Sequence, residues 1–198
     1  MFFRITGANS ERTQQVVGEL FGEDLNDDQS SVLNKIFQWM KFVTIDDDNV
    51  VFVAEGSESD GSGATWSFRG IITLSKNAGV WFINDLVSLG GVGGKLAAAA
   101  YKYISEHPAG GVHRGKVSLL SLNTKSDTFW QRQGSDFVGT GPSGRTTTDD
   151  PVPMEKDLNA PVVHPVAPDL SRSPPISRSR SASASGSSSP TLGDKKDF

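Results

Sequence analysis

The sequence of 198 residues contains no cysteine and only two tyrosines. Without cysteine, the chain can form no disulfide, no thiolate metal site and no cysteine nucleophile. No stretch approaches the ~18 consecutive apolar residues that a membrane-spanning helix needs. The first residues, Met1 to Arg4, lack the basic region and the apolar run of a signal peptide. We therefore expect a soluble, cytoplasmic protein that is long enough to bury a core of ordinary size.

Several catalytic signatures are also missing. The chain has no Gly-x-Ser-x-Gly nucleophile elbow and no His-Glu-x-x-His zinc site. Its three histidines, His107, His113 and His164, have no evident catalytic partner in the sequence, which favours a non-catalytic role for each. Hydrolase and metalloenzyme functions are therefore not favoured, and we predict no metal site.

The most informative stretch runs from Leu86 to Leu96, where an apolar strand leads through four glycines into an alanine-rich helix. The N-terminus of a helix carries unpaired N–H groups and a partial positive charge, so it attracts anions. Glycine at such a place lets a phosphate group approach the backbone closely. The pattern predicts a phosphate-binding loop, and the alternative is a tight strand-to-helix turn without a ligand.

The spacing of this loop does not fit two common nucleotide-binding motifs. A P-loop has a glycine where this chain has Leu89 and a hydroxyl residue where it has Leu96. A dinucleotide-binding loop needs a third glycine after Gly91-Val92-Gly93, and Leu96 again stands in its place.

The rest of the pattern alternates between strands and helices. Apolar spacing predicts helices after a cap at Asn9 or Ser10, around residues 32–40, after the glycines, and after a cap at Ser126 or Asp127. We expect strands near residues 2–5, 50–54, 66–75, 80–88, 116–122 and from residue 137. This order, β-α-α-β-β-β-α-β-α-β, indicates a mixed α/β sheet.

Three motifs on this order of elements resemble the GNAT superfamily of acyl-CoA-dependent N-acyltransferases, over residues 1–159. The loop Ser88–Gly93 resembles the family's Gln/Arg-x-x-Gly-x-Gly/Ala pyrophosphate loop. Asn123, Ser126, Trp130, Gly134 and Ser135 match a later motif, Asn-x-x-Ala-x-x-x-Tyr-x-x-x-Gly-Phe, in part. The segment Met154–Leu158 is similar to the Met-x-Lys-x-Leu pattern that closes the last strand.

The resemblance implies a mixed, mostly antiparallel sheet of six to seven strands, splayed between the fourth and fifth strands and flanked by about four helices. It implies that acetyl-CoA, or another acyl-CoA, donates its acyl group to a primary amine that attacks the thioester directly. The pantetheine arm would lie between the splayed strands, and the pyrophosphate would bind to the amides of the glycine loop. The cofactor-binding residues expected from this are Leu86, Val87, Ser88, Gly90, Gly91, Val92, Gly93, Gly94, Lys95 and Asn123.

The same resemblance points to two catalytic candidates, Asp85 and Trp130. Asp85 lies where members often have an acidic residue, and it would hold a water that deprotonates the amine; the alternative is a strand-edge carboxylate that accepts backbone N–H groups. Trp130 stands in place of the tyrosine that protonates the departing CoA, and an indole N–H releases no proton near neutral pH. Because Ser88 also departs from the usual Gln/Arg, a second candidate function is a non-catalytic module that binds acyl-CoA or a protein.

Charge gives the only indication of the acceptor. Five of the 19 Lys and Arg residues and three of the 23 Asp and Glu residues lie in residues 160–198, which leaves residues 1–159 with a net charge of −6. The acidic turn at residues 23–28 would attract a cationic amine, whether a small molecule or a protein amine, unless it is simply a solvated surface. We expect no direct nucleic-acid or membrane partner and leave a homodimer open.

The last part of the chain changes in composition. Residues 160–198 are rich in proline, serine and arginine and poor in apolar residues. Such a segment buries too little apolar surface to fold, so we expect a disordered tail. Its Arg-Ser repeats are typical kinase substrates, which makes phosphorylation an alternative to a merely solubilising role.

Overall fold

The structure is a computed structural model, and it describes residues 1–59, 63–110, 115–138 and 151–160. These residues belong to one compact unit, Met1–Pro161. The predicted tail falls almost entirely outside the described residues, so its disorder and its phosphorylation stay predictions. None of the described helices is long and apolar enough to cross a membrane.

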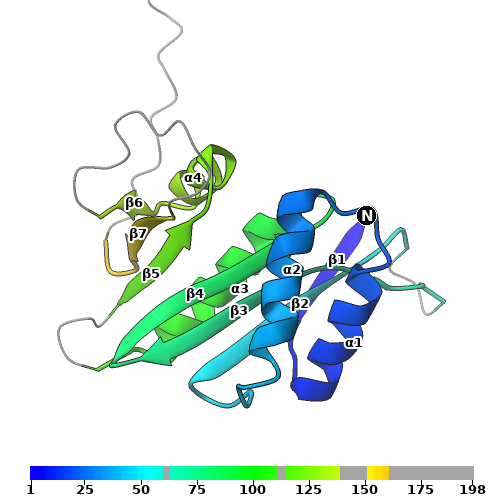
Figure 1. Cartoon of the computed structure of the whole chain (residues 1–198), viewed down its shortest axis with the longest axis horizontal. Helices are drawn as coiled ribbons and strands as arrows, with labels where there is room; N and C mark the ends of the chain where they lie inside the picture. Colours follow the sequence, from blue (N-terminus) through cyan, green and yellow to red (C-terminus); the bar gives the residue numbers. More distant parts are fainter. Residues whose placement is uncertain (60–62, 111–114, 139–150, 161–198) are drawn as a thin grey trace, which may run out of the picture. The chain divides into compact units, whose positions relative to one another are not determined.

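Seven strands and four helices follow the predicted order, with one further strand at the end (Figure 1). They are β1 (Phe2–Gly7), α1 (Ser10–Leu20), α2 (Asp27–Trp39), β2 (Asn49–Ser57), β3 (Ser67–Asn77), β4 (Val80–Ser88), α3 (Gly93–Glu106), β5 (Lys116–Ser121), α4 (Thr124–Arg132), β6 (Asp136–Phe137) and β7 (Val152–Asp157). The strands form one sheet in the order β1-β2-β3-β4-β5-β7-β6. Only the β4–β5 pair is parallel among the strand pairs described. The predicted fold class is therefore confirmed.

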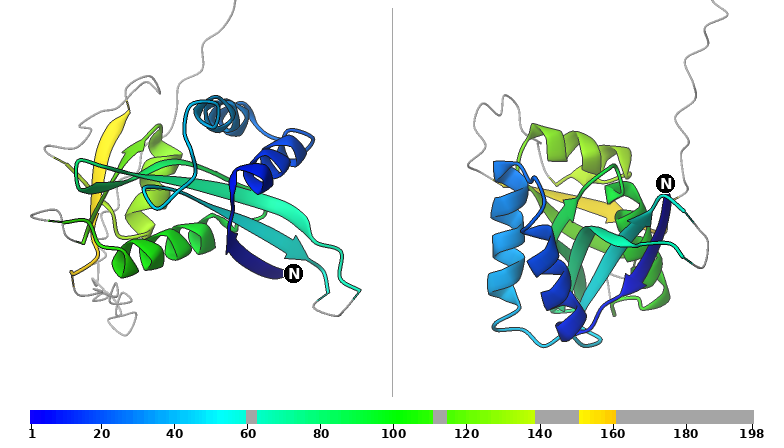
Figure 2. Two further views of the ribbon diagram at one scale, coloured as in Figure 1. Left: turned by 90° about the horizontal axis from the view of Figure 1, so that it is seen from below. Right: turned by 90° about the vertical axis from the view of Figure 1, so that its right-hand side faces the viewer.

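Helices cover both faces of this sheet (Figure 2). The apolar side chains of α1 and α2 pack with Val51, Val53 and Ile71 on one face. The apolar side of α3 packs with Ile72, Leu74 and other residues on the opposite face. Because successive side chains of a strand point to opposite faces of the sheet, the same strands contribute to both cores, as expected for a sheet buried on both sides.

Two helix starts test the capping predictions. Asn9 caps α1, because its side chain accepts a 2.8 Å hydrogen bond from the N–H of Arg12, as predicted. The predicted cap of α4 at Ser126 or Asp127 is wrong, since α4 begins after Asn123. Asn123 accepts from the N–H of Ser126, and the Ser126 hydroxyl accepts from the N–H of Asn123. This reciprocal capping box starts the helix three residues earlier than a serine cap would.

A β-bulge interrupts β4 at the point where the site lies. The register between β3 and β4 passes from Thr73↔Asp85 to Leu74↔Ile83, which leaves Asn84 as the extra residue. A bulge bends a strand and changes which side chains face each side of the sheet. It therefore controls how the second half of β4 presents its backbone and side chains.

Candidate functional site

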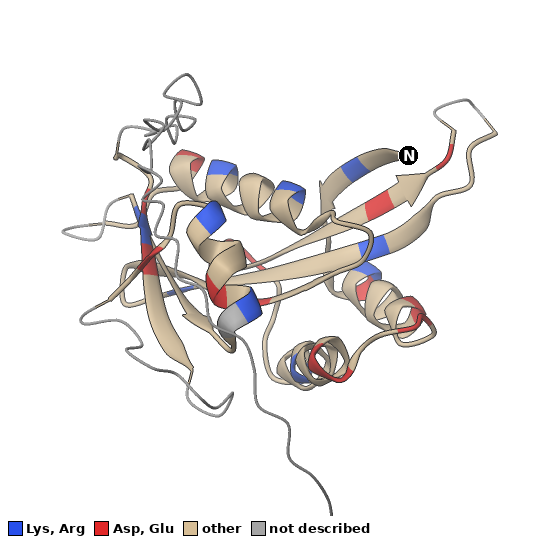
Figure 3. Cartoon of the chain, turned by 90° about the horizontal axis from the view of Figure 1, so that it is seen from above, with Lys and Arg blue, Asp and Glu red and all other residues tan. Residues whose placement is uncertain are grey.

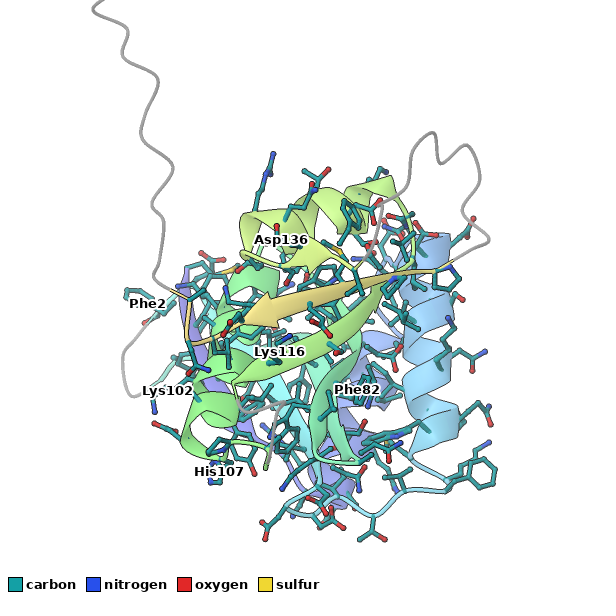
Figure 4. The ribbon with its side chains drawn as sticks, turned by 90° about the vertical axis from the view of Figure 1, so that its left-hand side faces the viewer. Phe2, Phe82, Lys102, His107, Lys116 and Asp136 are labelled. Carbon is teal, nitrogen blue, oxygen red and sulfur yellow. The ribbon has the colours of Figure 1, made fainter. Side chains whose placement is uncertain are left out.

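The centre of the sheet is splayed between β4 and β5. Only three residue pairs join these strands: Trp81↔Val117, Phe82↔Ser118 and Ile83↔Leu119. Beyond them β5 diverges from β4 (Figure 1), and a cleft of about 300 Å³ lies between the two strands. Figure 4 looks toward this region, with Phe82 marking β4 and Lys116 the start of β5. The splay that the resemblance implied is present.

The second half of β4 turns the backbone groups of two of its residues toward the cleft. The N–H of Leu89 donates to the carbonyl oxygen of Arg69 on β3 at 2.7 Å. Because strand residues alternate in direction, Val87 also points its backbone groups toward β3, whereas Leu86 and Ser88 point theirs toward the cleft. Leu86 and Ser88 line the cleft and Val87 does not. Of the three predicted backbone contacts, the structure places two at the cleft edge.

The glycine loop makes the turn from β4 into α3. Gly90 and Gly91 have φ values of 62° and 78°, a conformation that strongly favours glycine. Helix α3 starts at Gly93, and Val92 provides no side-chain cap. The N–H groups of Lys95 and Leu96 donate to the Val92 carbonyl oxygen, but those of Gly93 and Gly94 have no acceptor within the described part of the chain. Of these two donors, Gly94 is partly exposed and Gly93 is buried.

The first turn of α2 contacts both sides of the cleft. The side-chain amide of Gln29 donates to the carbonyl oxygen of Ser88 at 2.9 Å. The side-chain amide of Asn123 donates to Asp28 at 3.2 Å. Asn123, which was expected to face the cofactor, does line the cleft, but its side chain is engaged by α4 and α2. Sequence reasoning missed Gln29, although the Asn26-x-x-Gln29 capping box at the start of α2 is a visible local signal.

Asp85 lies on the cleft wall beside the bulge. Burial raises the pKa of Asp85 to about 6, against an opposing effect of Lys35 on α2. Its register partner Thr73 has a fully buried hydroxyl group with no hydrogen-bond partner in the described structure. Asp85 can therefore change its protonation state near neutral pH, as a general base must.

Trp130 lines the same cleft from α4. It is 6% exposed and packs edge to face against Phe129, with ring centroids 4.7 Å apart. Neither tyrosine lines the cleft, since both are on α3. The Tyr101 hydroxyl lies 3.3 Å from the Ser135 hydroxyl, and burial raises the pKa of Tyr101 to about 12.

The charged residues of the cleft are few. Among the residues that the structure describes, Asp28 and Asp85 are its acidic lining residues and Lys125 is its basic one. Lys125 belongs to the first turn of α4, which carries basic residues near both ends (Figure 3). Of the acidic turn predicted to attract the acceptor, Asp28 reaches the cleft, whereas Glu23, Asp24 and Asp27 do not line it.

No protein-family profile and no curated protein sequence matches the chain. Solved structures do match it, over 77–79% of this chain and 99–100% of each of the following three. A GNAT-family protein from Desulfovibrio desulfuricans has a TM-score of 0.52 at 10% identity. Escherichia coli ElaA has a TM-score of 0.51 and an IAA acetyltransferase from Bacillus cereus one of 0.50, both at 13% identity. From its sheet order, its central splay and these matches, the chain has the fold of the GNAT acetyltransferases.

Proposed function

We propose that the protein is a GNAT-superfamily N-acyltransferase that moves an acetyl or other acyl group from acyl-CoA to a primary amine. The observation that carries this proposal is the continuity of free backbone donors from the β4 edge to the start of α3. Leu86 and Ser88 offer a strand edge, and Gly93 and Gly94 offer free N–H groups just beyond it. A ligand with an amide-containing arm and a diphosphate matches both parts in this order.

Each part has a physical role in binding. An extended arm pairs with a free strand edge as an added strand does. The diphosphate binds where the helix N-terminus combines free N–H groups with a partial positive charge. Gly90 and Gly91 have no atom within 4 Å of the place where a Cβ would be, so a phosphate can approach their backbone. Val92 and Lys95 complete the loop, and the Lys95 side chain is exposed.

The acyl transfer requires few groups beyond the β4 edge and the glycine loop. The amine nitrogen attacks the thioester carbon, and negative charge develops on the thioester oxygen. An N–H of the β4 edge stabilises that charge, which is typically worth a few kcal/mol. Asp85, directly or through a water, takes the proton from the nitrogen. The C–S bond then breaks, and a thiol pKa of ~8.5 makes the thiolate a tolerable leaving group. The missing tyrosine costs on the order of 10²-fold in rate.

For the acceptor we propose a small-molecule or protein amine that carries positive charge. Asp28 and Asp85 both line the cleft, so a cation is favoured over an anion there. A panel of amines tests this idea by thiol release. Preference for neutral or acidic acceptors would contradict it.

A second candidate is a GNAT-like module that binds acyl-CoA without transferring the acyl group. The observation that favours it is the combination of Trp130 in place of an acid with an Asn123 side chain that is already engaged. Both candidates predict CoA binding, and only the enzyme releases thiol in the presence of amines.

A charged substitution at Gly94 tests whether the glycine loop binds the diphosphate of CoA. An added Cβ at Gly94 meets only Gln133, at 3.6 Å, so the position has room for a side chain. Aspartate in the first turn suits a helix, yet it repels a diphosphate. We expect Gly94→Asp to weaken CoA binding by more than about tenfold in calorimetry without lowering the unfolding temperature. Gly94→Ala isolates the effect of the added carbon. Equal CoA affinities of the aspartate and alanine variants would overturn the proposal.

A further inference from the structure

The cleft is closed at the end opposite the glycine loop. At that end β4 and β5 are still paired, and Ile83↔Leu119 is the last pair before they diverge. Both residues are only 3% exposed. Trp130 belongs to the same buried apolar cluster and lines the cleft beside them. An arm anchored at the loop and running back along β4 brings its acyl group to this apolar end.

The cleft as a whole has a small volume. A volume of about 300 Å³ is at the small limit of ligand pockets, and an extended arm takes up much of it. Residues as buried as Ile83, Leu119 and Trp130 are packed at the density of a protein interior. The indole is the largest side chain among those that form this wall.

We propose that Trp130 limits the length of the acyl group, so that the site accepts acetyl and excludes longer straight chains. This inference rests on the proposed function and gives Trp130 a role in specificity that replaces proton transfer. Its chemical content is steric: the indole fills the volume into which further methylene groups would extend.

The dependence of affinity on chain length distinguishes a filled end from an open one. In an open apolar site, each added methylene tightens binding about fourfold, the equivalent of ~0.8 kcal/mol. In a filled site, each one forces side chains out of place, and affinity falls. The wild-type protein should therefore bind acetyl-CoA more tightly than butyryl-CoA or hexanoyl-CoA.

Removing the indole should reverse this order. In Trp130→Ala, the space left by the indole is lined by apolar residues of the same cluster, such as Leu119 and Met154. An apolar cavity of about 150 Å³ stays dry and takes up small apolar groups. We expect hexanoyl-CoA to bind this variant at least tenfold more tightly than acetyl-CoA does.

The experiment measures dissociation constants of CoA, acetyl-CoA, butyryl-CoA and hexanoyl-CoA by calorimetry, without an acceptor amine. Trp81→Phe is the matched control, because Trp81 is 1% exposed in the same cluster but does not line the cleft. Trp130→Phe covers the case in which the alanine variant does not fold, and it should raise the butyryl-to-acetyl affinity ratio at least threefold. Trp81→Phe should leave that ratio as it is in the wild type.

The outcomes separate the two proposals. Wild-type protein that binds none of the four ligands contradicts the proposed function itself. Wild-type protein that binds CoA and acetyl-CoA, but binds hexanoyl-CoA equally well or better, overturns the role of Trp130 alone. So does an unchanged butyryl-to-acetyl ratio in Trp130→Phe.

Discussion

The side-chain amide of Gln29 donates a 2.9 Å hydrogen bond to the backbone carbonyl oxygen of Ser88. Ser88 is one of the two β4 residues whose backbone groups face the cleft, so this amide occupies a position that an amide of an incoming arm would use. The other end of the same side chain accepts from the N–H of Asn26 at 3.1 Å and caps α2. Gln29 thus links the start of α2 to the β4 edge through two hydrogen bonds of one side chain.

We expect Gln29→Met to tighten CoA binding by about two- to tenfold, because the competing hydrogen bond is worth ~0.5–1.5 kcal/mol. The measurement is calorimetric titration with CoA. Asn9→Ala is the control for lost helix capping, since Asn9 caps α1 and does not line the cleft. Weaker CoA binding in Gln29→Met would mean that Gln29 supports the ligand rather than competing with it.

Asp85 should give the protein a distinctive pH dependence. Its folded-state pKa of about 6 lies above its ordinary value. A carboxyl group whose pKa is higher in the folded state than in the unfolded state stabilises the fold at a pH below the unfolded-state pKa. This contribution to the free energy of unfolding is lost as pH rises from about 4 through about 6. We expect Asp85→Asn to remove that loss and to stabilise the fold above pH 6 by on the order of 2–3 kcal/mol. Denaturant unfolding at several pH values measures it.

Activity should follow the opposite course, because the base must be ionised. We expect kcat/KM to rise through about pH 6 in the wild type, and Asp85→Asn to lower it by about 10²–10⁴-fold without that rise. If the asparagine variant kept the wild-type pH profile, Asp85 would be a strand-edge carboxylate without a catalytic role.

The buried carboxylate of Glu55, which does not line the cleft, offers a test of stability alone. Glu55 is 4% exposed and accepts hydrogen bonds from Arg4 at 2.7 Å and Arg12 at 2.6 Å. The two guanidinium groups stack over Trp66 and Phe68 at 4.5 Å. The hydrogen bond from Arg4 is the main cause that lowers the pKa of Glu55, and burial opposes it.

We expect Glu55→Gln to lower the free energy of unfolding by about 1–2 kcal/mol. The loss is no larger because both arginines are partly exposed and solvent weakens their attraction to the carboxylate. A lowered pKa contributes stability above the ordinary pKa, and that contribution is lost as pH falls through the folded-state value. The difference between wild type and variant should therefore shrink below about pH 4. A difference that stays constant down to pH 2 would show that the charge is not its source.

Gly70 on β3 lies close to the backbone of β4. An added Cβ there would lie 2.6 Å from the Val87 carbonyl oxygen and 2.9 Å from the Leu96 side chain. Because backbone yields little, we expect Gly70→Ala to destabilise the fold by about 2–3 kcal/mol in thermal or urea unfolding. Gly7→Ala on β1 meets no atom within 4 Å and serves as the neutral control. Equal stability of the two variants would contradict this packing.

The sequence was sufficient wherever the signal is local. The cap at Asn9, the turn at the glycine loop and the order of strands and helices each depend on residues close together in the chain. The cap of α4 was misplaced because Asn123 and Ser126 form a reciprocal pair, and single-residue preferences do not distinguish its two ends.

Features that depend on tertiary contact were not predictable in this way. Gln29 and Ser88 are 59 positions apart, and only the crossing of α2 over β4 brings them together. The direction of Val87 depends on the strand register, and the bulge at Asn84 shifts that register by one residue. The pattern of apolar residues alone could not show that the backbone groups of Leu86 and Ser88 face the cleft and those of Val87 do not.

The three residue pairs between β4 and β5 have a mechanical consequence. Four strands lie on one side of these pairs and three on the other, so the described structure joins the two halves of the sheet through three residue pairs. A molecule that fills the gap would bridge the two halves and slow amide hydrogen exchange in β5 and β7 as much as in β4. Ligand binding would thus also be detected as slower exchange in β7, whose residues do not line the cleft.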